Sequence, residues 1–225
     1  MTSLFPPEVI VEEADPREVQ GELDPREEGI VARAVARRRR QFLAGRVCAR
    51  RALSRLGVEG WVLAADSDRV PVWPAGIVGS IAHTDRYCVA AVARSERFAG
   101  IGVDAELIHR AKKELWRRIC TAEELAVISE LEESKRALSV ALAFSAKECF
   151  YKCQFPLTRS WLGFHDVVIH ASLETGLFEV EVVGVGEARG RLAASRAATL
   201  VAGARFEGRY VVRDEHVLTG MVMPA

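Results

Sequence analysis

The chain has 225 residues, of which 49% are hydrophobic and 28% charged, and its formal net charge is zero. This composition suits a globular protein with one large or two small domains, and the zero net charge predicts no nucleic-acid partner. No apolar run approaches the ~18 residues of a membrane span, and residues 1–8 lack the basic and apolar segments of a signal peptide. The expected location is the cytoplasm.

The first half of the chain predicts helix followed by strands. Residues 1–24 suit a strand or extended lead-in broken by prolines. Hydrophobic spacing then predicts a helix from Glu27 to Leu56, stopped by Gly57 and bent or divided at Gly45. Further extended segments are expected at 61–64, 69–74, 77–81, 87–93 and 100–106.

The second half begins with helices and continues with strands. Thr121 and Glu124 fit a capping box at the start of a helix. Ser134 is expected to cap the next helix, which runs to about Cys153 and is stopped by Pro156. Strands are expected at 165–171, 177–183, 199–206, 209–213 and 216–222, with turns at Gly208 and 214–215.

Because each half contains helices followed by strands, we expect an α+β protein with two similar-sized, tightly packed lobes. The predicted boundary separates residues 1–106 from residues 107–225. A cleft between the lobes is a usual place for a ligand. The five cysteines have no regular spacing and form neither a disulfide framework nor a zinc motif, so reduced, partly buried thiols are expected.

Two acidic residues end a predicted strand. Asp104 and Glu106 are two positions apart, so their carboxylates point to the same face. They could be a solvated strand end without a role. However, Asp104 follows the apolar run 101–103, where an unpaired buried carboxylate is costly, and a metal or a cationic partner would satisfy it.

A charged group follows on a predicted helix: Lys147, Glu148, Tyr151 and Lys152 fall on one broad face. Glu148 and Lys152 could be a surface ion pair at i,i+4 spacing. The residues before them are apolar nearly all round, which indicates a buried helix whose charges face a site. Three carboxylates with two lysines suit a divalent cation held against a phosphate.

Basic residues cluster earlier in the chain. Nine acidic residues and two arginines lie between Glu8 and Glu28, whereas eight arginines and no acid lie between Arg37 and Arg55. Such a field could attract a phosphorylated ligand. Arg38 and Arg46 are eight residues apart and share a helix face, whereas Arg50 and Arg51 are expected in solvent. His83, in a loop of small polar residues, could be structural or functional.

Taken together, these segments resemble the 4′-phosphopantetheinyl transferases of the large, pseudo-twofold, monomeric type, in the enterobactin synthase component D-like subgroup. The resemblance covers about residues 27–170 in order and spacing. The matching segments are 39–50, 71–84, 100–106, 144–152, 155–158 and 163–166.

The resemblance implies transfer of the 4′-phosphopantetheine arm of coenzyme A to a serine of an apo acyl or peptidyl carrier protein, releasing adenosine 3′,5′-bisphosphate. It implies magnesium held by Asp104, Glu106 and Glu148. It also implies contacts with coenzyme A from Arg38, Arg46, Arg69, Ser80, His83, Lys147 and Lys152. Arg69 would replace a lysine that many relatives carry in this loop, where Ala65 stands here.

In the implied reaction Glu148 is the candidate general base, directly or through a metal-bound water, and Lys152 neutralises the pyrophosphate. The carrier would belong to peptide, polyketide, siderophore or fatty-acid assembly. Two alternatives remain: a module that binds coenzyme A without chemistry, and a hydrolase of the coenzyme A pyrophosphate.

Overall fold

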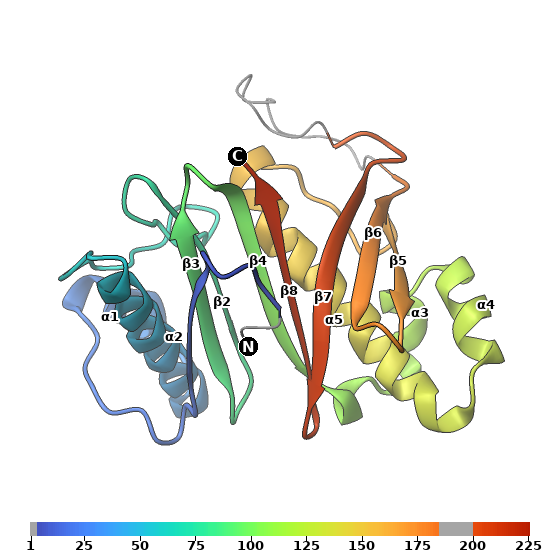
Figure 1. The fold of residues 1–225 in the computed structure, drawn as a ribbon. Helices are drawn as coiled ribbons and strands as arrows, with labels where there is room; N and C mark the ends of the chain where they lie inside the picture. The colour runs from blue at the N-terminus through green and yellow to red at the C-terminus, as the bar shows by residue number, and fades with distance from the viewer. Residues whose placement is uncertain (1–3, 185–199) are drawn as a thin grey trace.

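The computed structural model describes residues 4–184 and 200–225 and confirms the α+β class (Figure 1). The strands are β1 (Ile10–Ala14), β2 (Ile77–His83), β3 (Cys88–Arg94), β4 (Phe98–Leu107), β5 (Val167–Ser172), β6 (Leu177–Val182), β7 (Arg205–Arg213) and β8 (His216–Pro224). The helices are α1 (Pro25–Val31), α2 (Ala36–Arg55), α3 (Trp116–Ile119), α4 (Ala122–Glu130) and α5 (Glu133–Thr158), with short 3₁₀ helices η1 (Ile108–Arg110) and η2 (Lys113–Leu115).

The described strands form two antiparallel sheets. One has three strands in the order β1-β3-β2, and the other has five in the order β4-β8-β7-β6-β5. The long helix α2 packs on the first sheet and the long helix α5 on the second. This arrangement is consistent with the two predicted lobes, each with helices on a small antiparallel sheet.

Strand β4 joins the two halves. It pairs with β8 along its length, so it belongs to the second sheet, yet it also lies beside β2 of the first. Hydrophobic residues of β4, including Ile101 and Val103, are buried in a core shared with β3 and the N-terminal segment. The predicted lobe boundary at residue 106 remains a prediction, and it falls at the last residues of β4, the strand that connects the two halves.

The other face of β4 packs closely on α5. A Cβ atom added at Gly102 would lie 2.0 Å from the carbonyl oxygen of Cys149, and one at Gly100 would lie 2.7 Å from that of Cys153. Side chains alternate along a strand, so Asp104 points to the same face as these two glycines. The absence of side chains at positions 100 and 102 therefore lets the helix approach the strand just before the acidic residues.

The helices differ from the prediction at their ends. The first helical region is divided at residues 32–35 rather than at Gly45, which lies inside α2 against Ile81. Ser134 does not cap α5, because the helix begins one residue earlier, at Glu133. Pro156 does not stop α5 either; it lies in the last turn, where a proline removes only one backbone hydrogen bond. The capping box of Thr121 and Glu124 is confirmed.

Three predictions about strands and turns were wrong. Residues 61–64 form no strand, and the adjacent segment makes only an isolated bridge between Ala65 and Pro71. Gly208 lies inside β7 rather than at a turn, because a Cβ there would lie 2.1 Å from the ring of Phe178 on β6. The glycine makes room for this ring. The strand predicted at 199–206 was wrong for residues 200–204, which form no strand, because β7 begins only at Arg205; residue 199 lies outside the described residues.

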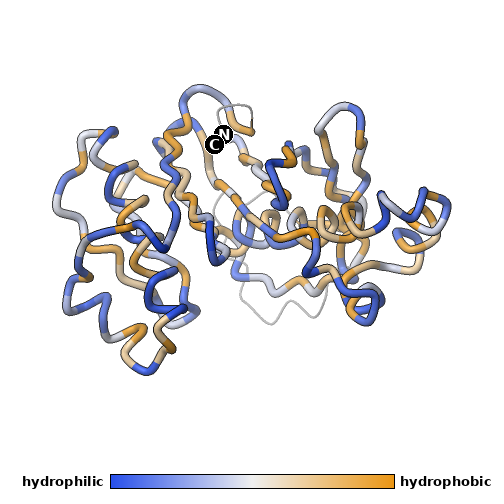
Figure 2. Tube along the Cα trace, turned by 90° about the horizontal axis from the view of Figure 1, so that it is seen from below, coloured by the Kyte–Doolittle hydropathy of each residue, from blue (hydrophilic) through white to orange (hydrophobic). Residues whose placement is uncertain are grey.

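Hydrophobic residues lie along the strands and α5, whereas the peripheral loops are largely hydrophilic (Figure 2). All five cysteines are free, as predicted, and all five are buried rather than partly buried. No helix among residues 4–184 and 200–225 is long and apolar enough to cross a membrane.

Replacement of Gly102 with alanine tests the contact between β4 and α5. Because the new Cβ would lie 2.0 Å from a backbone oxygen, we expect the free energy of unfolding to fall by roughly 1–3 kcal/mol in urea titrations. Gly29→Ala is the matched control, since Gly29 lies in α1 with open space around it. Equal stability of Gly102→Ala and the original chain would contradict the close approach.

Candidate active site

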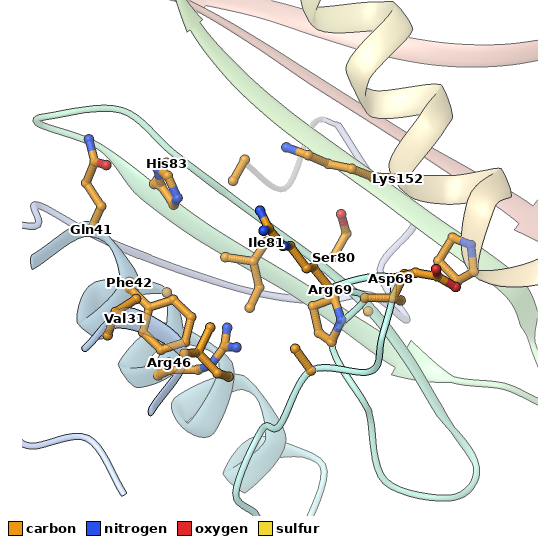
Figure 3. Close-up of a pocket in the computed structure, with 18 of the residues that line it drawn as sticks. Val31, Gln41, Phe42, Arg46, Asp68, Arg69, Ser80, Ile81, His83 and Lys152 are labelled. Carbon is orange, nitrogen blue, oxygen red and sulfur yellow. The ribbon is translucent and has the colours of Figure 1, made fainter. Parts of the chain in front are cut away.

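A cavity of about 650 Å³ lies between the two halves (Figure 3). Its walls come from α1, α2, the loop 65–71, β2 and the C-terminal part of α5. This volume is typical of small-molecule sites. Six of the seven predicted coenzyme A contacts line it: Arg38, Arg46, Arg69, Ser80, His83 and Lys152.

Arg38 and His83 form a pair on one side of the cavity. The Nη1 of Arg38 lies 2.5 Å from the Nε2 of His83, and since a guanidinium can only donate, this ring nitrogen accepts. Burial, and then the charges of Arg38 and Lys152, lower the pKa of His83 to about 4. The ring is therefore neutral near pH 7, and its Nδ1 carries a proton for which the described residues provide no acceptor.

Arg46 is a buried cation in the same wall. Its side chain is 6% exposed, its guanidinium lies 4.0 Å from the centre of the Phe42 ring, and its Nε is 3.9 Å from a carboxylate oxygen of Glu27. Burial lowers the pKa of Arg46 to about 10 against the opposing charge of Glu27. This Nε has no hydrogen-bond partner among the described residues. An anionic ligand in the cavity would be attracted to this cation.

Glu27 of α1 stabilises the position of α2, the helix that carries the arginines. It is fully buried and accepts hydrogen bonds from Arg50 and from the backbone of Leu63 and Asp24. Arg50 therefore does not extend freely into solvent as predicted, because it makes an ion pair with Glu27 at 2.8 Å. The buried carboxylate fixes α1 and α2 relative to each other, and so helps to place Arg46.

Asp104 on β4 is held by two residues of α5. It is 4% exposed, and one carboxylate oxygen accepts a hydrogen bond from the Nζ of Lys152 at 2.7 Å. The other accepts one from the hydroxyl of Ser145 at 2.8 Å. Burial alone would lower the pKa of Lys152, but the charge and hydrogen bond of Asp104, together with the charge of Glu148, raise it overall. Lys152 therefore remains charged while lining the cavity.

Three predicted carboxylates share this electrostatic environment. Burial, and then the charge of Asp104, raises the pKa of Glu106 to about 7 and raises the pKa of Glu148. Lys152 acts on both in the opposite direction. Burial and the neighbouring carboxylate therefore outweigh the lysine at both glutamates.

The predicted metal ligands do not form a ready three-residue site. Within residues 4–184 and 200–225, no three His, Cys, Asp or Glu side chains are arranged so that they could hold a metal ion together. One oxygen of Asp104 faces the Lys152 ammonium instead. The assignment of Asp104, Glu106 and Glu148 to a metal therefore remains a prediction.

Lys147 lies apart from Lys152, and its predicted phosphate contact finds no support. Its side chain is 1% exposed, and its Nζ donates to Glu124 and to the carbonyls of Ile119 and Phe164 at 2.7–3.0 Å. Five residues along a helix correspond to about 140° of rotation, so the two lysines point to different sides. Lys147 stabilises the packing of α5 against α3 and α4.

Sequence reasoning assigned no role to Ser145, although its position was informative. It lies three residues before Glu148 and seven before Lys152, which places all three on one helix face. It bonds both Asp104 and, at 2.8 Å, the hydroxyl of Thr219 on β8. Thr219 is the cross-strand neighbour of Asp104, a relation that only the pairing of β4 with β8 reveals.

The raised pKa of Glu106 predicts a pH-dependent stability in metal-free buffer. The folded chain keeps a proton on Glu106 up to about pH 7, whereas the unfolded chain releases it near 4.5. Stability should therefore decrease as the pH rises between these values. Thermal unfolding with EDTA from pH 5 to 8 measures this, and Glu106→Gln should flatten the curve. Parallel curves for the two proteins would contradict the shift.

Comparisons with known proteins agree with the earlier resemblance. Two family models match: the 4′-phosphopantetheinyl transferase N-terminal domain at residues 26–93 and the 4′-phosphopantetheinyl transferase superfamily at residues 100–189. The chain is 34% identical to 4′-phosphopantetheinyl transferase Npt of Nocardia iowensis over 88% of this chain and 87% of the relative. It is 37% identical to PptT of Mycobacterium tuberculosis over 67% and 65%, respectively.

Enterobactin synthase component D of Salmonella typhi is 35% identical over 52% of this chain and 48% of the relative. A solved holo-(acyl-carrier-protein) synthase from Bacillus anthracis has a TM-score of 0.37 and 18% identity over 57% of this chain and 98% of that chain, a likeness too weak to support an argument. The two family models and the relative from Nocardia iowensis cover most of the chain. The chain belongs to the 4′-phosphopantetheinyl transferase superfamily and is similar to its enterobactin synthase component D type.

Proposed function

We propose that this transferase moves the 4′-phosphopantetheine group of coenzyme A to a serine of an apo acyl or peptidyl carrier protein. The observation that carries the proposal is the cavity, which cations from both halves of the chain line and in which one of them, Lys152, is paired with the neighbouring carboxylate of Asp104. Family membership supplies the reaction type. Acceptors from siderophore, polyketide and peptide assembly all fall within this proposal.

The cavity offers several groups to the phosphates of coenzyme A. Arg38 and Arg46 come from α2 and line the cavity, and Figure 3 shows Arg46 on α2 and Arg69 on the loop 65–71. These three cations suit the 3′-phosphate and the pyrophosphate. His83 is neutral, so it would act by donating a hydrogen bond from Nδ1 rather than by its charge. Ser80 accepts a hydrogen bond from the Val103 backbone, which leaves its own hydroxyl proton available to donate.

The reaction forms one phosphorus–oxygen bond and breaks another. The carrier serine oxygen attacks the phosphorus that bears the pantetheine arm, and the bond from this phosphorus to the bridging oxygen breaks. Adenosine 3′,5′-bisphosphate leaves with the electron pair, and the serine proton passes to a base. Because negative charge increases on the leaving oxygen, nearby fixed cations favour the transition state over the ground state.

Lys152 and Glu148 are the residues that we assign to this step. Lys152 is charged, lines the cavity and is oriented by Asp104, so it would compensate charge on the pyrophosphate. Glu148 is the candidate base for the serine proton, because burial and Asp104 raise its pKa and strengthen it as a base. Direct transfer and transfer through a bound water are both compatible with this role.

The donor set fits a magnesium ion. Hard oxygen ligands are present at Asp104, Glu106 and Glu148, and burial, followed by the charge of Asp104, raises the pKa of both glutamates, which a bound cation would counteract. Magnesium binds through only one or two carboxylates when phosphates and waters complete its shell, so a ready three-residue site is not required. A bound ion would neutralise and polarise the pyrophosphate oxygens.

We further propose that the chain acts as a monomer in the cytoplasm. The cavity is complete within one chain, since both of its walls come from the described residues. Light scattering after gel filtration measures the mass in solution. A stable dimer would contradict this proposal.

Incubation with coenzyme A, magnesium and apo carrier proteins tests the function. We expect intact-mass spectrometry to show one added phosphopantetheinyl group on the carrier serine, with release of adenosine 3′,5′-bisphosphate. No adduct on any of several carriers would contradict the proposal. Coenzyme A binding without turnover would indicate a binding module, and nucleotide release without a carrier would indicate a hydrolase.

Two isosteric variants test the carboxylates. We expect Asp104→Asn and Glu148→Gln each to reduce the transfer rate by roughly 100-fold or more, because each removes a charge at the reacting phosphates. Glu133→Ala is the matched control: it removes a carboxylate from the same helix, at a side chain that is 81% exposed. If both variants transferred as fast as Glu133→Ala at every magnesium concentration tested, the assignment of these carboxylates to the site would be wrong.

A further inference from the structure

The loop 65–71 forms part of the cavity wall. Asp68, Arg69 and Val70 of the loop line the cavity, as do Tyr151, Lys152 and Phe155 of α5. Figure 3 shows Asp68 and Arg69 on the loop and Lys152 on the helix. Arg69 has a positive φ of 65°, a conformation that non-glycine residues adopt rarely and at an energetic cost. The loop therefore needs specific interactions to keep this shape.

Asp66 organises the loop from within. One of its carboxylate oxygens accepts hydrogen bonds from the backbone N–H groups of Asp68 and Val70, at 3.0 and 2.9 Å. Its backbone N–H donates to the carbonyl of Val70, and Ala65 and Pro71 form a bridge across the base. These bonds close the loop on itself, but none of them connects it to α5.

Arg159 makes that connection. It follows α5, has a positive φ of 53°, and its backbone N–H donates to the carbonyl of Phe155. Its Nη1 lies 2.7 Å from the second carboxylate oxygen of Asp66 and 3.0 Å from a carboxylate oxygen of Asp68. Burial would raise the pKa of Asp66, but the Val70 N–H and Arg159 outweigh it and lower the pKa. One guanidinium thus ties the loop to the end of the helix.

We propose that Arg159 is a positioning residue for coenzyme A: it fixes the loop 65–71 against α5 and so preforms the cavity wall that carries Arg69. It does not line the cavity itself, so its effect passes through Asp66 and Asp68. It also compensates two negative charges at the edge of a cavity that would receive a polyanion. A preformed wall saves the ligand the entropic cost of ordering the loop. This inference rests on the proposed function.

The test compares coenzyme A binding with turnover in the full chain. We expect Arg159→Ala to raise the Kd for coenzyme A, measured by calorimetry without carrier, and its KM on the order of tenfold. The turnover number at saturating coenzyme A should stay within about twofold, because no reacting group is altered. The Kd of Arg159→Lys for coenzyme A should lie between those of the original chain and Arg159→Ala, since an ammonium keeps the charge but not the guanidinium geometry.

The chain contains a matched control. Arg205 on β7 also bonds two carboxylates two positions apart, Glu179 and Glu181, both at 2.7 Å, and its side chain is 55% exposed, against 42% for Arg159. Arg205→Ala should leave Kd, KM and turnover unchanged. Adding Asp68→Asn to Arg159→Ala should produce less than the sum of the two separate effects, because the residues act as a unit.

Several outcomes would overturn the inference: an unchanged Kd in Arg159→Ala, an equal change in Arg205→Ala, or a lower turnover number with unchanged Kd. A melting temperature lowered equally in both arginine variants, with Kd raised in both, would indicate general destabilisation and also overturn it. Coenzyme A binding by the original chain without transfer would contradict the proposed function alone, and the binding comparison would still decide the role of Arg159. Absence of binding in the original chain would reject both.

Discussion

The ion pair between Asp104 and Lys152 is the interaction on which the site depends. A carboxylate that is 4% exposed needs a close partner, because an unpaired buried charge costs several kcal/mol. Lys152 provides that partner at 2.7 Å while lining the cavity. The pairing is possible because two glycines of β4 let α5 approach the strand. The ion pair of the site therefore depends on the close backbone packing of β4 on α5. Lys152 both stabilises the buried Asp104 and lines the cavity.

The distribution of charge matters more than its sum. The chain has no net charge, yet arginines of α2 and the loop 65–71 converge with Lys152 on one cavity. Carboxylates outside the cavity hold some of these cations in place; Glu27 lies under Arg46, and Asp104 beside Lys152. These two buried carboxylates therefore orient the basic residues of the cavity. A mean composition cannot express this division, because it depends on which carboxylates are buried.

Local periodicity predicted much of the site. The strand alternation that places Asp104 and Glu106 on one face, and the eight-residue spacing of Arg38 and Arg46, both depend only on neighbouring residues. Relations between distant segments could not be predicted in this way. Arg159 and Asp68 are 91 residues apart, and no local pattern connects them. Gly208 was misassigned for a related reason: its role is to accept the Phe178 ring from a neighbouring strand, whereas a single sequence reads a glycine as a turn.

The two lysines at positions 147 and 152 show how far a shared motif can mislead. They have the same side chain and lie within six residues, but the helix directs one toward Glu124 and the other toward Asp104. Burial lowers the pKa of Lys147, and Glu124 and two carbonyl groups occupy its three donors. It has no donor left for a phosphate. Lys152 keeps one side in the cavity, so only this lysine can serve a ligand there. The role of each lysine therefore depends on the direction in which its side chain leaves α5. Two side chains five residues apart on a helix point in different directions.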